Sequence, residues 1–259
     1  MSGFSFAKQR VSIQGRKRKY MTEPRRVVLL DLDGTLTESG PGIIKCVIKA
    51  FEAVDVPVPN DEALQRFIGP AIIDSMKLNG IPPQKLDEAV RVYRHFYGDA
   101  NVFDDPNEPG RKVPGRLVNS MYEGIPEQLR KMREMGYYLA VCTAKPEYQA
   151  IPICEHFHLT DLVDGIYGAS KDNSRITKEA VITYALDRIG VDRNSGDRAL
   201  MVGDRWTDVD GAKLNGLDCL GCGWGYAEPN ELREHGAYRV VPFVSELADA
   251  VNDYFTERQ

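Results

Sequence analysis

Residues 26–37 read Arg-Val-Val-Leu-Leu-Asp-Leu-Asp-Gly-Thr-Leu-Thr, an unbroken apolar run that leads into acid and glycine. Such a run predicts a buried parallel strand whose carboxyl end opens into a loop. Residues 138–143 (Tyr-Leu-Ala-Val-Cys-Thr) and 199–204 (Ala-Leu-Met-Val-Gly-Asp) repeat this design. Amphipathic patterns typical of helices lie between such runs, for example over residues 178–189. Strands that alternate with helices predict an α/β fold built on a doubly wound parallel sheet.

The stretch between the first two of these strands is too long for a single crossover, which needs about 30 residues. Helices are expected from Pro41 and over about residues 84–97, and the Pro- and Gly-rich residues 104–115 predict an irregular loop. We therefore expect a smaller helical domain inserted after the first strand. The expected division is a basic N-terminal extension without regular structure (1–24), an α/β catalytic core (25–36 and 123–259) and a helical cap (37–122).

The composition, 42% hydrophobic and 27% charged, excludes a disordered or fibrous protein. No apolar run reaches the roughly 18 residues of a membrane span. Five cysteines without a paired pattern favour a reducing, cytoplasmic location. Eight Lys/Arg and one Glu lie within residues 1–26, so a net charge of −5 for the chain leaves an acidic body. This acidity disfavours nucleic acid and anionic membranes as partners.

Polar side chains follow the predicted strands at the point where each strand ends. In an open parallel sheet these ends share one crevice, so we expect Asp31, Asp33, Thr143, Asp204 and Asp208 to meet there. A single Asp at such a place is often only a turn former or a helix cap. Four converging carboxylates, however, repel one another unless a cation lies between them. Oxygen ligands suit Mg²⁺, so the sequence predicts a magnesium site.

The motifs resemble those of the haloacid dehalogenase-like (HAD) hydrolase superfamily over about residues 26–250. Asp-Leu-Asp-Gly-Thr-Leu-Thr at 31–37 is similar to the first motif of the family, and Gly-Asp-Arg-Trp-Thr-Asp at 203–208 resembles the fourth. Thr143 and Lys178 stand where the second and third motifs are usual. The helical insert resembles the cap of the phosphoglycolate phosphatase-like branch. Four further segments also resemble this branch, namely Phe67-Ile-Gly-Pro70, Tyr122-Glu-Gly-Ile-Pro126, Thr143-Ala-Lys-Pro146 and Trp224-Gly-Tyr226.

The resemblance implies a role for each motif residue. Asp31 would be the nucleophile that forms an aspartyl phosphate, and Asp33 the acid and base. Thr143 would bind the phosphoryl group, and Lys178 would neutralise charge. The implied Mg²⁺ ligands are Asp31, Asp33 through its main-chain carbonyl, Asp204, and Asp208 indirectly. Lys171 competes with Lys178 for its role, and Arg175 is also nearby. Lys145 is either a substrate contact or a surface residue.

These expectations describe a Mg²⁺-dependent phosphomonoesterase with no other cofactor. Its substrate would be a small metabolite resembling phosphoglycolate, a nucleotide or a sugar phosphate. The alternatives are a sugar-phosphate mutase of the same superfamily and a phospho-acceptor signalling domain. We expect a cytoplasmic monomer or weak dimer. Basic residues of the 103–119 loop, namely Arg111, Lys112 and Arg116, are expected at the pocket rim.

Overall fold

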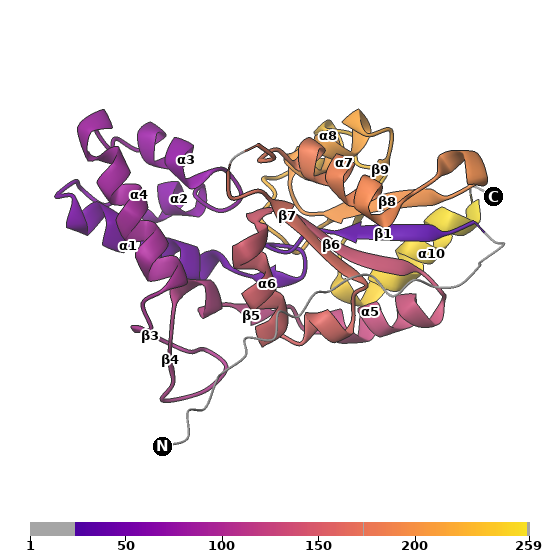
Figure 1. Cartoon of the computed structure of the whole chain (residues 1–259), viewed down its shortest axis with the longest axis horizontal. Helices are drawn as coiled ribbons and strands as arrows, with labels where there is room; N and C mark the ends of the chain where they lie inside the picture. Colours follow the sequence, from indigo (N-terminus) through magenta and orange to yellow (C-terminus); the bar gives the residue numbers. More distant parts are fainter. Residues whose placement is uncertain (1–23, 173, 258–259) are drawn as a thin grey trace, which may run out of the picture.

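A six-stranded parallel sheet forms the centre of the larger of two lobes in the computed structural model, which describes residues 24–172 and 174–257 (Figure 1). The predicted doubly wound parallel sheet is confirmed. The extension expected over residues 1–24 lies, apart from Pro24, outside the described residues. In sheet order the strands are β10 (Arg239–Val241), β9 (Asp218–Cys222), β8 (Arg198–Gly203), β1 (Arg26–Leu30), β6 (Tyr138–Pro146) and β7 (Gly165–Ala169).

Side chains alternate between the two faces of this sheet, so the continuous apolar strands are buried on both sides. Val28 and Leu30 of β1 belong to one apolar cluster, whereas Val27 and Leu29 belong to another. The first cluster includes residues of α5 (Ile125–Glu134), α6 (Glu147–His156) and α10 (Leu247–Glu257). The second includes residues of α7 (Lys178–Ile189), α8 (Trp206–Leu214) and α9 (Glu231–Glu234). Both faces are thus covered by helices (Figure 1).

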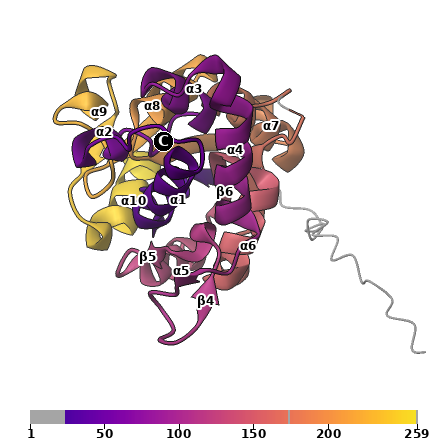
Figure 2. The ribbon, with the colours of Figure 1, turned by 90° about the vertical axis from the view of Figure 1, so that its left-hand side faces the viewer.

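Four helices form the second lobe, which lies at one end of the sheet (Figures 1 and 2). They are α1 (Gly40–Ala53), α2 (Asp61–Gln65), α3 (Ile72–Leu78) and α4 (Pro83–Gly98). Pro41 stands in the first turn of α1, where a missing N–H costs no hydrogen bond. The lobe has its own apolar cluster, in which Phe51, Phe67 and Met76 are almost fully buried. Burial of these large side chains stabilises the lobe separately from the sheet.

Two chain crossings join the lobes. β2 (Thr37–Glu38) leads out of the sheet region and pairs antiparallel with β5 (Ser120–Met121), which leads back. Residues 104–115 are not wholly irregular, because β3 (Phe103–Asp104) and β4 (Lys112–Val113) form a short hairpin. The expectation of an irregular loop was wrong at its ends, where an ion pair between Lys112 and Asp104 joins two directly opposed residues. The 3-10 turns are η1 (Gly115–Leu117), η2 (Leu159–Asp161), η3 (Arg193–Ser195) and η4 (Val244–Glu246).

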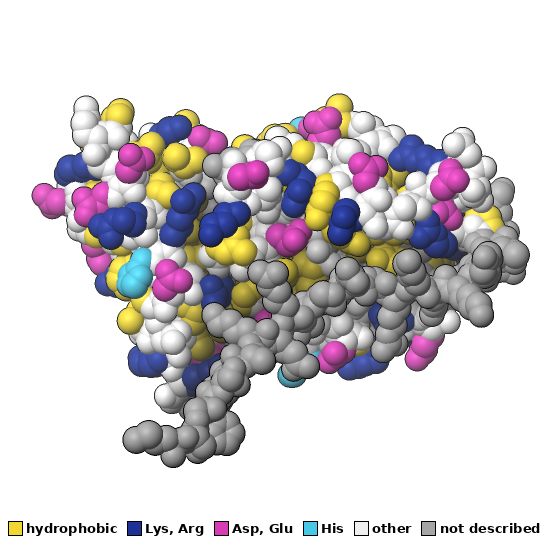
Figure 3. All heavy atoms as spheres, in the orientation of Figure 1, with side chains coloured by type: hydrophobic (Ala, Val, Ile, Leu, Met, Phe, Trp, Pro, Cys, Tyr) yellow, Lys and Arg dark blue, Asp and Glu magenta, His cyan; other side chains and the backbone are white. Residues whose placement is uncertain are grey.

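Basic and acidic side chains are interspersed over the face seen in Figure 3. Within the parts of the chain that the structure describes, no helix is long and apolar enough to cross a bilayer.

Candidate active site

Three carboxylates meet at the carboxyl ends of two adjacent strands. Asp31 directly follows β1, and its main-chain N–H donates to the Val202 carbonyl of β8 at 2.9 Å. Asp204 follows β8, and Asp208 lies in the first turn of α8. Carboxylate oxygens of the three aspartates lie within 4.8 Å of one another, and all three residues are buried. The topology therefore brings together three of the four carboxylates that the sequence assigned to this crevice.

Lys178 supplies positive charge to this cluster. It is the first residue of α7, whose N-terminus is capped by the Thr177 side chain. Its Nζ lies 2.8 Å from Asp31 Oδ1 and 2.7 Å from Asp208 Oδ1, and the side chain is buried. Lys171, the competing candidate, instead lies over the exposed Tyr148 ring. The structure thus places Lys178, and not Lys171, beside Asp31.

Asp204 is fixed from several sides. Thr35 Oγ1 donates to its Oδ1 at 3.0 Å, and the Tyr226 main-chain N–H donates to its Oδ2 at 2.8 Å. Gly34 has φ +80, and a Cβ at Gly34 or Gly225 would lie within 2.2 Å of Asp204 atoms. Both positions must therefore remain glycine for the carboxylate to occupy this place.

Burial and mutual repulsion perturb these groups strongly. Burial raises the pKa of Asp204 well above its usual range, and the charges of Asp208 and Asp31 add to that shift. Burial also raises the pKa of Asp208 to about 6, against the opposing effect of Lys178. For Lys178 burial disfavours the charged form, but the two carboxylates hold its pKa above its ordinary value.

One ammonium group does not balance three carboxylates. Full ionisation of the three would leave a surplus of buried negative charge, which is costly unless it is paired. A divalent cation would offset it, and a set of carboxylate oxygens suits a hard cation such as Mg²⁺. The residues present therefore fit the expected metal.

Asp33 lies at the same edge but has a different neighbour. Its Oδ2 is 2.7 Å from Lys145 Nζ, and that lysine side chain is only 7% exposed. Lys145 is therefore a buried partner of Asp33, which the sequence left open. The position of Lys145 in the sequence, two residues after Thr143, already indicates this place, because it lies near the end of β6, the strand next to β1.

Thr143 stands beside this pair in β6. It is buried, and its Oγ1 accepts a hydrogen bond from the Lys145 main-chain N–H at 3.2 Å. The carbonyl of the preceding residue, Cys142, accepts a hydrogen bond from Lys178 Nζ at 3.2 Å. Thr143 is thus adjacent to both lysines of the site.

The three basic loop residues differ in their surroundings. Arg111 pairs with Glu108 at 2.9 Å, and Lys112 pairs with Asp104 at 2.7 Å, both in the exposed hairpin. Arg116 instead reaches inward, and its guanidinium donates to Gln149 Oε1 at 3.1 Å. Its Nε is buried and has no hydrogen-bond partner among the residues described. Arg116 therefore differs from Arg111 and Lys112, because no carboxylate of the described residues pairs with its charge.

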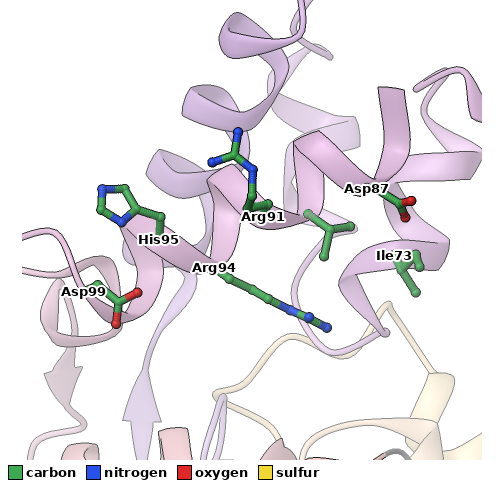
Figure 4. A pocket seen from close by; sticks show the side chains of 7 residues that line it. Ile73, Asp87, Arg91, Arg94, His95 and Asp99 are labelled. Carbon is green, nitrogen blue, oxygen red and sulfur yellow. The ribbon is translucent and has the colours of Figure 1, made fainter. Parts of the chain in front are cut away.

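A surface hollow of about 510 Å³ lies elsewhere, on the helical lobe (Figure 4). Residues of α3 and α4 line it, and Arg91 and Arg94 point away from each other there. It shares no residue with the strand-end cluster. Among the described residues, the hollow has no cluster of carboxylates that shift one another's pKa values, as the strand ends have. The strand ends are therefore the stronger candidate for a catalytic site.

Comparisons with known proteins agree with this geometry. Residues 28–222 match the profile of the family described as haloacid dehalogenase-like hydrolases. A 5'-nucleotidase of Pseudomonas aeruginosa is 34% identical over 209 residues, which are 80% of this chain and 87% of that protein.

Two further comparisons have similar identity. The tyrosine-protein kinase PtkA of Mycobacterium tuberculosis is 35% identical over 79% of this chain, which spans 64% of that protein. The crystal structure of a predicted phosphatase from Clostridium acetobutylicum superposes with a TM-score of 0.76 and 32% identity, covering 89% of this chain and 100% of that one.

Proposed function

Because the chain belongs to the haloacid dehalogenase-like hydrolase family, we propose that it is a Mg²⁺-dependent phosphomonoesterase that forms an aspartyl phosphate on Asp31. The resemblance seen in its motifs is confirmed, and with it the prediction of a phosphatase of this family, which relatives named 5'-nucleotidase and phosphoglycolate phosphatase also support. The observation that carries the mechanistic proposal is the contact of Lys178 with Asp31, inside a cluster of three buried carboxylates.

In the first half-reaction the Asp31 carboxylate attacks phosphorus, and the bond between phosphorus and the ester oxygen breaks. Asp33 gives its proton to the departing alcohol oxygen. Lys178 holds Asp31 and, with the Thr143 hydroxyl, stabilises the phosphoryl oxygens as charge develops on them. The products of this step are the free alcohol and a phosphoryl group on Asp31.

In the second half-reaction Asp33 removes a proton from water, which attacks the same phosphorus. The bond to Asp31 breaks, and inorganic phosphate leaves. Asp31 is thereby returned as a carboxylate, and Asp33 regains its proton. One residue serves as acid and then as base, so the cycle closes without another titratable group.

The metal would be held by Asp31, Asp204 and the main-chain carbonyl of Asp33, with Asp208 acting indirectly. When bound, the cation offsets the repulsion between these carboxylates and a phosphate dianion. Asp208 also accepts from the Arg205 main-chain N–H at 3.0 Å, so its carboxylate joins α8 to Lys178.

We propose the domain division expected from the sequence, with residues 37–122 as a cap over the core of residues 25–36 and 123–259. Tyr226 Oη accepts from the Gly40 main-chain N–H at 2.8 Å, and Arg205 donates to the Ile68 carbonyl at 2.9 Å. These contacts hold the helical lobe against the catalytic edge. A covered site suits a small phosphate ester. We further propose that the protein is cytoplasmic and acts as a monomer or weak dimer.

The names of two similar relatives differ in the acceptor of the phosphoryl group. A nucleotidase transfers it to water, and a tyrosine kinase to a phenol. We propose water for this chain, because Asp33 lies two residues after the nucleophile, where it can act as the base. No feature of the described residues separately favours the mutase or the signalling domain.

Release of inorganic phosphate from para-nitrophenyl phosphate, with Mg²⁺ and with excess chelator, tests this proposal. We expect turnover with Mg²⁺ and none with chelator. Adding a peptide tyrosine as acceptor should leave phosphate release unchanged. Activity that survives chelation would contradict the metal requirement, and phosphotyrosine formation in place of phosphate release would contradict hydrolysis.

A further inference from the structure

Lys145 bridges the two lobes next to the expected acid. Its Nζ lies 2.7 Å from Asp33 Oδ2 in the core and donates to Tyr97 Oη of α4 at 2.5 Å. The same ammonium group lies 4.9 Å from the centroid of the Tyr97 ring. A single buried cation therefore contacts the expected acid on one side and the helical lobe on the other.

Tyr97 is itself held firmly. It is buried, and its ring stacks on Tyr93 of the same helix, with centroids 5.3 Å apart and planes 11° from parallel. Burial, followed by the charge of Asp33, raises the pKa of Tyr97 well above its ordinary value, so the phenol remains neutral and can accept from Lys145. The position of Lys145 is thus fixed by the packing of α4.

Asp33 depends on this lysine for its orientation. Its other oxygen, Oδ1, is buried and accepts no hydrogen bond from any residue within the described chain. The contact with Lys145 is at Oδ2, which can accept from the ammonium group in the acid form as well as in the carboxylate form, and Oδ1 is left to carry the transferred proton. A side chain with one anchored oxygen and one free oxygen is suited to delivering a proton in a defined direction.

We propose that Lys145 is a positioning residue that aims Asp33 at the leaving oxygen, and that Tyr97 holds Lys145 in place from the cap. This inference rests on the proposed function, since it assigns the means by which the acid of that reaction is oriented. It adds a cap residue to the acid step, which the motifs alone do not supply.

The leaving group provides a readout that a merely structural role would not affect. Para-nitrophenolate leaves without a proton, whereas the alkoxide of benzyl alcohol is strongly basic and must be protonated as it leaves. The two phosphate esters are similar in size. The kinetic constant kcat/KM reports only the steps through formation of the aspartyl phosphate, so the later role of Asp33 as base does not enter.

The experiment compares kcat/KM for benzyl phosphate and para-nitrophenyl phosphate in the full chain. For Lys145→Met we expect a loss of about 100-fold or more with benzyl phosphate, in the range found for general acid catalysis, and a far smaller loss with para-nitrophenyl phosphate. Tyr97→Phe keeps the stacked ring and removes one hydrogen bond, so we expect the same asymmetry at about 10-fold. Lys145→Arg, which keeps the charge, should recover part of the loss with benzyl phosphate.

Lys49→Met is the matched control, because Lys49 is an exposed lysine of α1 that pairs with Glu52, and both constants should stay at the wild-type value. Equal losses on the two esters in both Lys145→Met and Tyr97→Phe would overturn the positioning role while leaving the phosphatase intact. Unchanged kcat/KM for both esters in both variants would overturn the positioning role as well. A wild-type chain that hydrolyses neither ester would refute the proposed function and this inference with it.

Discussion

Lys178 Nζ lies 2.8 Å from Asp31 Oδ1, inside a cluster that is buried from solvent. The same ammonium group contacts Asp208, so a single cation at the start of α7 serves two carboxylates from different elements. Removing one partner of a buried ion pair leaves the other charge without compensation. The stability of the core and the proposed chemistry therefore depend on the same side chain.

Replacement of Lys178 by Met should both inactivate and destabilise the protein. We expect a loss of about 3–5 kcal/mol in the free energy of unfolding for the metal-free chain, as for other broken buried pairs. Urea unfolding followed by circular dichroism measures this difference. Excess Mg²⁺ should recover part of the stability but not the turnover. An unchanged unfolding midpoint would show that Lys178 is not needed to balance the cluster.

Replacement of Asp31 by Asn should abolish turnover and leave the fold intact. Asn has nearly the same shape but no nucleophilic carboxylate, and loss of a covalent nucleophile costs about 10⁴-fold or more in kcat. Steady-state phosphate release checks the activity, and the melting temperature checks the fold. A folded variant that keeps more than a few per cent of wild-type kcat would contradict the role of Asp31.

Stabilisation by Mg²⁺ should grow as pH rises. The pKa of Asp208 is raised to about 6 in the folded chain, above the value of about 3.9 expected when it is unfolded. Without metal, this group therefore favours the folded state at low pH, and its contribution is lost as pH rises from about 4 through about 6. The raised pKa of Asp204 acts in the same direction.

Protons and Mg²⁺ compete for these carboxylates, so metal binding should strengthen over the same range. We expect the increase in melting temperature caused by Mg²⁺ to be small near about pH 5 and larger near about pH 7. The Asp204→Asn variant serves as the comparison and should show little increase at either pH. A wild-type increase that is independent of pH would argue against buried carboxylate ligands.

Arg116 and Arg111 form a matched pair for substrate recognition. Arg116→Ala should raise KM about tenfold with little change in kcat, because its partly buried guanidinium has no carboxylate partner among the described residues and remains available to the substrate. Arg111→Ala removes ion pairs to Glu108 and, at 3.8 Å, to Asp105, so its charge is already paired within the loop and its loss should change neither constant. Michaelis–Menten measurements on 2-phosphoglycolate or another turned-over metabolite compare the two. An equal rise in KM for both variants would argue against a specific role of Arg116, and an unchanged KM for Arg116→Ala would contradict that role.

The sheet could be predicted from the sequence because its strands are unbroken apolar runs. Val27 to Leu30 are all buried, and an uninterrupted run of this kind is typical of a strand covered on both faces. The polar residues directly after β1 and β8 could also be predicted to lie near Thr143, since parallel strands end at one edge, although β6 continues past Thr143 to Pro146.

Lys145 and Tyr97 could not be assigned from the sequence alone. The burial of Lys145 depends on its contact with Tyr97 of α4, a helix from a distant part of the chain. Likewise, Arg116 differs from Arg111 because it reaches Gln149 of α6, whereas Arg111 pairs locally with Glu108. In each case the deciding contact joins segments that are far apart in the sequence.

The central claim, that Asp31 carries the phosphoryl group, is tested most directly by trapping that group on the protein. The Asp33→Asn variant should form the aspartyl phosphate from para-nitrophenyl phosphate and hydrolyse it slowly, because water is no longer activated. Mass spectrometry of peptides from the acid-quenched mixture identifies the modified residue. We predict a phosphoryl group on Asp31 that is absent in the Asp31→Asn, Asp33→Asn double variant. A phosphoryl group on another residue, or phosphate release at the wild-type rate without any labelled peptide, would contradict the account.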